Sequence, residues 1–458
     1  MYNDIMNFLD IEDDSLEITG IYVEGDYKII KVKQRVKKIN CPICGNRMYS
    51  KGLEERTLEH PILNDGFKVR VLFTQRRLQC SAPYCSHRMN QPSNIVGKYK
   101  QHTLKAELII MDKFRDLRLT ARQIAQSCQM SDTNAYYLFM SYVTCNRAKL
   151  PRVLSVDEVY IDINERDKYA VILMNWETGQ IIDILSSRWN QVTEKYFYSI
   201  PYEERKNVDY VISDMYDPYL QFTEKYFPNA VSVTDSFHVI QNMNKRLVQY
   251  ANKLKRNYDE DSLEYYLLSN YNWFLTIDER YVHYSSKKKY SKKYHGKVTI
   301  AHIRSDFFSI NPNLMKLKKL RDKYYLFNEF KNPDGTPKNR DDLKKELDSI
   351  IKEYTTSGFQ IFEEVAATLQ KYKEFIINSF VALDGINRRM SNGPMESLNR
   401  KPKDYKRIAR GFSNFDYLRA RLIWATTPNL PIKGNPRSIK ELKAKYATNI
   451  IRGKYKKK

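Results

Sequence analysis

The stretch Val153-Leu-Ser-Val-Asp-Glu-Val-Tyr-Ile161 is an apolar, β-branched run that carries one acid, Asp157, in its middle. A run of this composition is typical of a buried strand. A solvated acid at the edge of a sheet is a poor explanation for Asp157, because both of its flanks are apolar. We therefore predict a strand here and treat Asp157 as a candidate functional residue.

The pattern that follows predicts four further strands and two helices. The strands cover residues 169–174, 180–185, 208–213 and 230–234, and the helices cover residues 193–198 and 218–227. A Glu177-Thr-Gly179 turn between apolar runs indicates hairpin connections among the first strands. Three hairpin strands followed by alternating helix and strand are the order of a ribonuclease-H-like fold. In that fold the first strand is central and the fourth strand is its neighbour.

Asp214 directly follows the fourth predicted strand, so we expect its side chain and that of Asp157 to meet at one edge of the sheet. Adjacent carboxylates repel each other, and divalent cations offset the repulsion while bridging a phosphate. Two ions about 4 Å apart activate the attacking oxygen and stabilise the leaving oxygen of an in-line displacement. The pair therefore predicts a metal site, which a later helix would complete with a third carboxylate.

Glu396 is the candidate for this third carboxylate. Asn392 suits a helix cap before Pro394, which places Glu396 in the first turn of the helix. The segment that follows is basic, as a metal site facing DNA requires. Its eight basic residues are Arg400, Lys401, Lys403, Lys406, Arg407, Arg410, Arg419 and Arg421. The alternative is a surface acid that the helix dipole favours near the N-terminus.

The whole sequence is basic, with 77 Lys and Arg against 54 Asp and Glu and a net charge of +23 over 458 residues. A basic surface attracts polyanions, and counterion release makes nucleic acid the natural partner. No apolar run approaches the roughly 20 residues of a bilayer span. The acidic start MYNDIMNFLDIEDD is neither a signal peptide nor a transit peptide. We expect a cytoplasmic bacterial protein, associated with the nucleoid and without a membrane partner.

Four of the six cysteines form two pairs, Cys41-Pro-Ile-Cys44 and Cys80-Ser-Ala-Pro-Tyr-Cys85, separated by 35 residues. Two cysteines on one tight turn hold a tetrahedral zinc ion at about 2.3 Å, and a second pair completes four ligands. The alternatives are buried thiols or two disulfides. The longer second loop also leaves His87 or His60 as a substitute ligand. The other two cysteines are expected to be core thiols: Cys128 and Cys145.

A helical pattern begins near Thr103, and its apolar positions are Leu104, Leu108, Met111, Phe114 and Leu117. Beyond it, Thr120 and Ser131 each suit an N-cap, and the second of these helices is expected from about Asp132 to Tyr142. Ala125 would pack closely against this second helix.

Two helices in this arrangement fit a helix-turn-helix, whose second helix enters the major groove of DNA. Arg122 and Asn134 are then candidate DNA contacts. The motif is imperfect, because Gln129 stands where a turn glycine is common and Ala135 where a larger aliphatic residue is expected. A small helical bundle is the alternative.

Residues 241–380 are Tyr- and Lys-rich and helical in pattern, which indicates an inserted helical domain. Within it, residues 285–297 hold six lysines with interleaved tyrosines. Phosphate contacts and base stacking are both conceivable there, with Lys287, Lys288 and Lys289 as candidate DNA contacts. A solvated surface loop is the alternative.

Several motifs follow one another along the chain. They are Cys41-Pro-Ile-Cys44-Gly45, Ser155-Val-Asp157-Glu158, Asp214-Met-Tyr-Asp-Pro-Tyr219, Thr234-Asp-Ser-Phe-His-Val239, Ser391-Asn-Gly-Pro-Met-Glu-Ser-Leu-Asn399 and Arg410-Gly-Phe-Ser-Asn-Phe415. This set resembles the ISL-three insertion-sequence family of DDE transposases, in the same order over nearly the whole chain. Tyr216 departs from the family, which often has tryptophan there.

The resemblance implies a DNA transposase whose acidic triad maps onto Asp157, Asp214 and Glu396. Two Mg²⁺ or Mn²⁺ ions on this triad would activate water to cut a phosphodiester, and then the freed 3′-hydroxyl for strand transfer. The four cysteines would hold a structural Zn²⁺. The partners would be the terminal inverted repeats of the element and target DNA, bound by a homodimer. Asp235 and His238 are expected close by, without a direct role at the metal ions.

The expected fold is a multidomain α+β chain with a ribonuclease-H-like core split by a helical insertion. The domains would be a zinc-binding module (1–100), a helix-turn-helix (101–150), the first part of the core (151–240), the insertion (241–380), the second part of the core with Glu396 (381–430) and a basic tail (431–458). One rival is a DNA-binding regulator that keeps the scaffold without activity, although all three carboxylates are present. The other is a nuclease of the same fold that cuts without joining.

Overall fold

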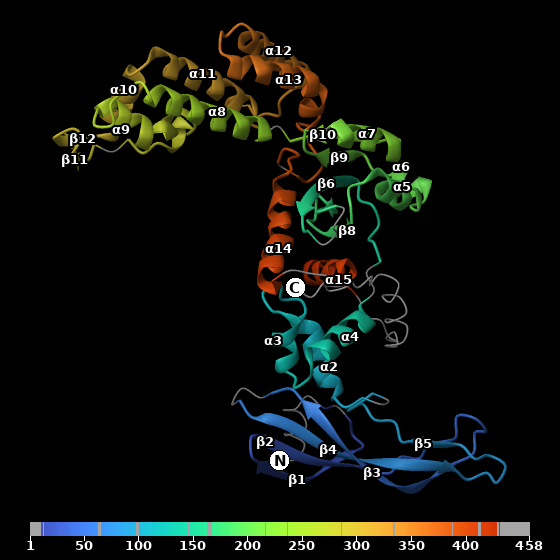
Figure 1. Ribbon diagram of the computed structural model, residues 1–458. Helices are drawn as coiled ribbons and strands as arrows, with labels where there is room; N and C mark the ends of the chain where they lie inside the picture. Colours follow the sequence, from blue (N-terminus) through green and yellow to red (C-terminus); the bar gives the residue numbers. More distant parts are fainter. Residues whose placement is uncertain are drawn as a thin grey trace, which may run out of the picture. The chain divides into compact units, whose positions relative to one another are not determined.

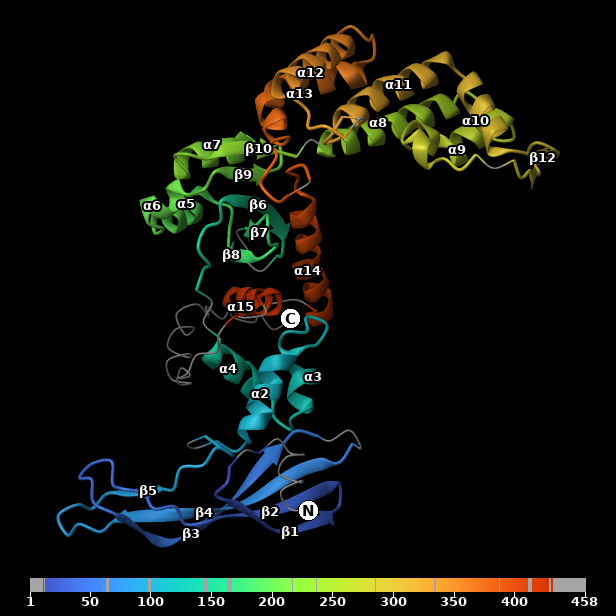
Figure 2. The same ribbon diagram turned by 180° about the vertical axis from the view of Figure 1, so that it is seen from behind.

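The computed structural model describes residues 11–430 except 12, 63–65, 98–99, 144–145, 163–166, 216, 236, 285, 333–334, 387, 411–413 and 428–429. Most of the acidic start, Cys145, Tyr216 and the predicted basic tail at 431–458 lie outside the described residues. The chain divides into two compact units, shown in Figures 1 and 2. The first comprises residues 1–147, 160–168 and 400–458, and the second comprises residues 148–159 and 169–399.

The first unit begins with a five-stranded sheet. Its strands are β1 (Leu16–Glu24), β2 (Tyr27–Gln34), β3 (Met48–His60), β4 (Lys68–Cys80) and β5 (Arg88–Asn90). Their order is β1-β2-β4-β3, and β5 pairs with the end of β4. Strands β2 and β4 are parallel, whereas β1 with β2 and β3 with β4 are antiparallel. Because side chains alternate along a strand, β4 buries Val69, Val71 and Phe73 in one core.

His60 ends β3 and links the sheet to the first helix. Its side chain is buried, and Nδ1 lies 2.9 Å from Oγ1 of Thr103, the N-cap of α2 (Leu104–Lys113). Burial, assisted by the positive charge of Lys105, lowers the pKa of His60 to about 4. The ring is therefore neutral at physiological pH.

We expect the region around His60 to lose stability as pH falls from about 6.5 to about 4. An unfolded histidine binds its proton near pH 6.5, so in this window the unfolded state holds more protons, and each unit of difference is worth about 1.4 kcal/mol. NMR titration of the ring measures the pKa of His60 in the folded protein. Hydrogen exchange of the β3 amides at each pH, corrected for the intrinsic exchange rate, measures the loss of local stability. In His60→Gln the local stability should depend less steeply on pH. An unchanged slope would contradict the assignment of this pH dependence to His60.

Three helices follow the sheet: α2, α3 (Ala121–Gln126) and α4 (Asp132–Tyr142). The predicted caps are confirmed, since Thr120 forms a capping box with Gln123 and the hydroxyl of Ser131 accepts from the backbone N–H of Asn134. Ala125 is buried in the core that these helices share, as predicted.

The predicted apolar face of the first helix is partly wrong. The helix ends at Lys113, before Leu117, and Leu108 is 56% exposed. Met111 and Phe114 are buried as predicted, and the other buried side chains of this helix are Ala106, Glu107 and Ile110.

Gln129 occupies the turn between α3 and α4 in the left-handed conformation, with φ of 55°. This is the conformation that makes glycine common at such a turn. The side chain compensates for the strain, because its Nε2 donates to the backbone oxygens of His60 and Val69, at 2.8 and 3.0 Å. The glutamine side chain, which a glycine would lack, therefore links the turn to the sheet.

The last described helix, α15 (Phe415–Thr426), packs on α2–α4 within the first unit. The indole nitrogen of Trp424 donates to the backbone oxygen of Met111 at 2.8 Å, and the guanidinium of Arg115 lies over the Trp424 ring. Arg421 is completely buried and donates to the backbone oxygens of Asp116 and Leu119. The expectation that Arg421 belongs to a DNA-facing basic surface is therefore wrong.

The second unit contains a mixed five-stranded sheet and its covering helices. The elements are β6 (Val153–Tyr160), β7 (Tyr169–Asn175), β8 (Ile181–Leu185), α5 (Asn190–Tyr198), α6 (Tyr202–Lys206), β9 (Tyr210–Ser213), α7 (Asp217–Tyr226) and β10 (Val231–Thr234). The order is β10-β9-β6-β7-β8, with β9 parallel to both β6 and β10. The first strand is thus central and the fourth is its neighbour, as predicted. Figure 1 shows α5–α7 on one side of this sheet, and α14 (Gly393–Ala409), whose residues up to Asn399 belong to this unit, begins on the other.

A helical segment separates β10 from α14 and has a hydrophobic core of its own, from Val239 to Phe380. Its elements are α8 (Phe237–Lys255), α9 (Leu263–Asn270), η1 (Asn272–Leu275), η2 (Glu279–Tyr281), β11 (Lys289–Ser291), β12 (Gly296–Val298), α10 (Ile300–Ser309), α11 (Pro312–Phe327), α12 (Arg340–Thr355) and α13 (Gln360–Asn378). Helix α13 returns to the sheet, where the amide of Asn378 donates to the backbone oxygen of Ser232 at 3.0 Å. Among the described residues, no helix has the length and apolar character to cross a bilayer.

Candidate functional site

Asp157 lies on the face of β6 that looks toward α14. Leu154 and Val156 belong to the core beneath α5 and α7, whereas Val153 belongs to the core on the opposite face. Because side chains alternate along a strand, Ser155 and Asp157 share the face of Val153. The hydroxyl of Ser155 accordingly donates to Oδ1 of Asn392, which immediately precedes α14. Asp157 is thus directed at the start of this helix.

The neighbouring Glu158 points the other way. Its carboxylate accepts a hydrogen bond from the hydroxyl of Tyr219 at 2.9 Å and pairs with Arg188 at 2.8 Å. Both of its oxygens are therefore already engaged by side chains on the far side of the sheet. Of the two adjacent acids in Asp157-Glu158, only the first belongs to the site.

Asp214 follows β9 and is joined to Asp157 through one amide. Nδ2 of Asn392 lies 2.8 Å from Oδ1 of Asp214 and 3.5 Å from Oδ2 of Asp157. The predicted meeting of the two aspartates at one edge of the sheet is therefore seen. The amide that lies between them was not predicted.

Glu396 stands in the first turn of α14, and His238, near the start of α8, connects it to Asp214. The Nε2 atom of His238 is 3.0 Å from Oδ1 of Asp214 and 3.6 Å from Oε1 of Glu396. The three candidate carboxylates thus come from three different elements. Asn392 and His238 are the side chains that they share.

Asn392 was expected to be a helix cap, but its side chain serves the carboxylates instead. It is completely buried, and its backbone N–H donates to Oδ2 of Asp235 at 2.7 Å. Asn399, one turn beyond Glu396, donates from Nδ2 to Oδ2 of Asp157 at 2.7 Å. In the sequence, the spacing of residues 392, 396 and 399 was the pattern that could have indicated both asparagines, because residues three or four positions apart lie on one face of a helix.

The electrostatics of the site reflect this crowding of acids. Burial and, next, the negative charge of Asp214 raise the pKa of Asp157 to about 6. The hydrogen bond to Asp214 raises the pKa of His238 to about 9, so the imidazole is positively charged at neutral pH. Positive charge is thus already favoured beside Asp214 and Glu396.

The donor set fits a hard divalent cation, since Mg²⁺ and Mn²⁺ prefer carboxylate and amide oxygens. Oδ1 of Asn399 is buried and accepts no hydrogen bond from the described residues, which leaves one free oxygen beside Asp157. The three acids are not gathered as tightly as ligands of a single ion. Within the described part of the chain, only the four cysteines form a group of three or more candidate ligands within 4.8 Å of one another.

These four cysteines, Cys41, Cys44, Cys80 and Cys85, form the second candidate site. Their sulfurs lie 3.8 Å apart between Cys41 and Cys85 and 3.3 Å apart between Cys44 and Cys80, and all four are free thiols. Four ligands at about 2.3 Å from a tetrahedral ion would stand about 3.8 Å from one another. The cluster can therefore hold a metal ion, and neither His60 nor His87 belongs to it.

Local backbone structure brings the cysteines together. Gly45, with φ of 75°, closes the first turn by donating to the backbone oxygen of Cys41 at 2.9 Å. The backbone N–H of Asn46 lowers the pKa of Cys44 to about 6, which favours the thiolate that a metal ion requires. Cys128, by contrast, is buried in the helical core, as predicted for an ordinary core thiol.

The candidate DNA contacts are mostly exposed. Arg122 and Asn134 lie on the surface of α3 and α4, and Lys287–Lys289 lie before and at the start of β11. On α14 the exposed basic side chains are Arg400, Lys401, Lys403 and Arg407, followed by Arg410. Lys406 differs, since it is half-buried, 3.9 Å from Asp162 and over the ring of Tyr160.

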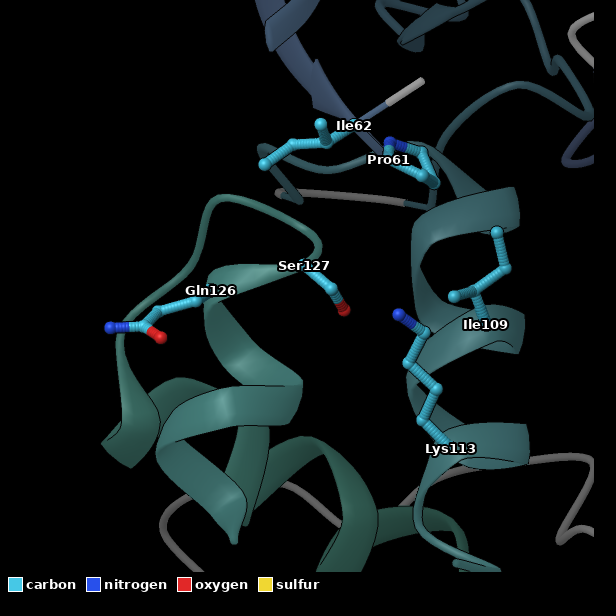
Figure 3. Close-up of a pocket in the computed structure, with 6 residues that line it drawn as sticks. All are labelled: Pro61, Ile62, Ile109, Lys113, Gln126 and Ser127. Carbon is cyan, nitrogen blue, oxygen red and sulfur yellow. The ribbon is translucent and has the colours of Figure 1, made fainter. Parts of the chain in front are cut away.

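A hollow of about 490 Å³ opens in the first unit beside the end of β3 (Figure 3). Figure 3 shows the side chains of Lys113 and Ser127 directed toward each other across it. The other lining residues are Pro61, Ile62, Ile109 and Gln126. Among the described residues that line it, Lys113 is the one charged side chain, and none is an acid or a cysteine.

A family model described as a transposase, of the ISL3 type of DDE transposases, matches residues 154–422. The match covers more than half of the chain and includes Asp157, Asp214 and Glu396. It does not extend to the four cysteines or to α2–α4. No curated protein matches the sequence.

Proposed function

The chain belongs to the ISL3 family of DDE transposases, and from this membership we propose that it cuts DNA at the ends of a mobile element and joins them to target DNA. Transposase function follows from the family. The cutting and joining steps, the acids that carry them and the DNA sites are the parts that we propose. The observation that carries the proposal is the convergence of Asp157, Asp214 and Glu396 on Asn392 and His238.

In this proposal Asp157, Asp214 and Glu396 hold the divalent ions. When bound there, Mg²⁺ ions offset the charge of the scissile phosphate and lower the pKa of the attacking water. Asn392 and Asn399 would orient the two aspartates, the first by donating to Oδ1 of Asp214 and the second by donating to Oδ2 of Asp157. His238 holds positive charge between Asp214 and Glu396 when the ions are absent. The order of the sheet, with β6 central and parallel to β9, supports a ribonuclease-H-like core.

We further propose that the four cysteines bind structural Zn²⁺ and that α3 and α4 form a helix-turn-helix. The distances between the sulfurs support the first assignment. The capped helices, and the turn at Gln129 in a conformation typical of glycine, support the second. Together these elements would recognise the ends of the element, while the basic residues after Glu396 would contact the DNA backbone.

The test is incubation of the purified protein with Mg²⁺ and a labelled DNA that carries the flanks of its own gene. Cleaved ends together with joined products on a gel would support the transposase reaction. Cleavage without joining would instead indicate a nuclease of the same fold. Tight binding without metal-dependent cutting would indicate a DNA-binding regulator.

Asn392→Ala is expected to lower the rate of cleavage about 10- to 100-fold, the usual cost of losing a residue that orients metal ligands. Without the amide, Asp157 and Asp214 repel each other and lose their fixed orientation. A positioning role predicts that higher Mg²⁺ recovers part of the rate, which a titration of the metal measures. Asn244→Ala, in α8 beside Arg321, is a control outside the site. Cleavage by Asn392→Ala at the wild-type rate and the same Mg²⁺ optimum would contradict the role.

A further inference from the structure

The helical segment of the second unit contains a hollow of about 890 Å³ beside the β11–β12 hairpin. Its lining includes three tyrosines, four lysines and His283, but no acidic side chain among the described residues that line it. Pockets for small ligands commonly have volumes of about 300–1,000 Å³. The hollow therefore has the size of a ligand site, and its lining favours an anionic ligand with a flat ring.

The positive charge of this hollow is concentrated on the hairpin. Lys289 and Lys292 are exposed, and no ion pair is seen between either of them and an acid of the described chain. Lys293 differs, because it contacts the carboxylate of Asp261 at 3.4 Å and the backbone oxygen of the same residue at 2.9 Å. Lys289 and Lys292 are therefore available to a phosphate group.

The aromatic rings supply a second, independent feature. Tyr271 stacks on Phe274 at 5.9 Å with an interplanar angle of 16°, and the ring of Tyr266 meets Tyr271 edge to face at 5.9 Å. These two rings are thus fixed by packing. Tyr290, on the hairpin, is 67% exposed. An exposed ring that lines the same hollow as two fixed rings suits a planar base, because aromatic side chains stack on the bases of unpaired nucleic acid.

We propose that this hollow binds one unpaired nucleotide of DNA, with its base against the tyrosines and its phosphate on Lys289 and Lys292. The proposal rests on the proposed function, since it assumes that DNA is the substrate. Duplex DNA buries the faces of its bases by stacking, so only an unpaired base can enter the hollow. A double-stranded backbone would contact the lysines without using the tyrosines.

The hairpin lies at the end of the helical segment away from β9 and β10 in both views (Figures 1 and 2). Asp214 follows β9 directly, so the hollow and the acidic site occupy different parts of the second unit. The unpaired nucleotide therefore differs from the one whose phosphodiester is cut. The hollow would serve to select distorted DNA and hold it during cleavage.

The test compares two duplexes that contain the element end, one fully paired and one with a single unpaired 2-aminopurine nucleotide. Binding to the full-length protein is measured in Ca²⁺ by anisotropy and by 2-aminopurine fluorescence. We expect about tenfold tighter binding of the duplex with the unpaired nucleotide, the effect of roughly one stacked base, together with quenched fluorescence. Equal binding of both duplexes by the wild-type protein would overturn the proposal.

Substitutions inside and outside the lining distinguish binding in the hollow from general affinity for DNA. Tyr290→Ala should abolish both the preference and the quenching, and Tyr290→Phe should retain them because the ring remains. Tyr281→Ala is the matched control, since Tyr281 is 68% exposed in the same segment but does not line the hollow. Lys289→Ala should likewise weaken the preference more than Lys288→Ala, because Lys288 is outside the lining. Equal effects of target and control substitutions would overturn the proposal.

Cleavage of the fully paired duplex in Mg²⁺ is measured with the same preparations. If the wild-type protein cleaves this duplex but shows no preference for the unpaired nucleotide, the nucleotide site alone is wrong. If the wild-type protein does not cleave this duplex, the proposed function is wrong, whatever the binding preference shows.

Discussion

Asp157→Asn is expected to abolish DNA cleavage and joining, with a loss of rate on the order of 10³-fold or more. The substitution is nearly isosteric but removes the negative charge that a divalent cation needs. Asn399 donates to Oδ2 of Asp157 at 2.7 Å, so the new amide would turn its oxygen toward Asn399. Its NH₂ group would then lie beside the backbone N–H of Glu158, which donates to Oδ1 of Asp157 at 2.7 Å, and no anionic oxygen would remain for the cation.

DNA binding should survive this substitution, because the basic residues of α14 and the helices α2–α4 are unchanged. Cleavage is measured on labelled DNA in Mg²⁺, and binding is measured by gel shift in Ca²⁺. Cleavage by Asp157→Asn at a rate comparable to the wild-type rate would remove Asp157 from the proposed site.

Asp217→Asn is the matched control for this experiment. Asp217 begins α7, three residues after Asp214, but its carboxylate pairs with Lys371 and accepts from the hydroxyl of Tyr372 at 2.7 Å. It makes no contact with the candidate site, so the same chemical change there should leave cleavage nearly unaltered. Equal losses in both variants would indicate a general effect on the second unit rather than a catalytic one.

The sheet of the second unit could be predicted from the sequence because its strands are short, apolar and separated by clear turns. The predicted strand at 153–161 corresponds to Val153–Tyr160, and that at 208–213 to Tyr210–Ser213. Alternation along β6 then decides which of Asp157 and Glu158 joins the site. These properties depend on neighbouring residues, which is the information that a single sequence contains.

Features that depend on distant contacts could not be predicted. Arg421 looks like a surface cation in sequence, yet it is buried because it satisfies carbonyl oxygens at Asp116 and Leu119, some 300 residues earlier. Asn392 looks like a helix cap, yet its amide serves Asp157 and Asp214. In both cases the neighbouring sequence suggests one role for the polar side chain, but the side chain instead binds a partner that lies far away in the sequence.

Cys44→Ser is expected to release the proposed zinc ion and to unfold the loops around the four cysteines. A serine hydroxyl stays protonated at neutral pH and is a poor zinc ligand, whereas the thiol of Cys44 ionises readily. Binding of structural zinc contributes on the order of 10 kcal/mol to the folding of small domains. The apolar cluster here is small, comprising Cys41, Met48, Leu78, Cys80 and Ala82. It cannot replace a contribution of that size.

Zinc content of the purified protein, measured by mass spectrometry, should fall from one ion per chain to nearly none in Cys44→Ser. Cys128→Ala is the matched control, because it removes a buried thiol of the helical core and should keep one zinc ion per chain. Full zinc content in Cys44→Ser would contradict the assignment of the four cysteines.

Loss of zinc should affect recognition of the element ends differently from DNA cleavage. The cysteines belong to the first unit and Asp157, Asp214 and Glu396 to the second, so loss of zinc should impair specific binding of the element ends first. Metal-dependent nicking of unrelated DNA, which needs only the acidic site, should persist in Cys44→Ser. If zinc-free protein bound the element ends with unchanged affinity and sequence preference, the cysteine cluster would have no part in recognition. The helix-turn-helix would then carry recognition without it.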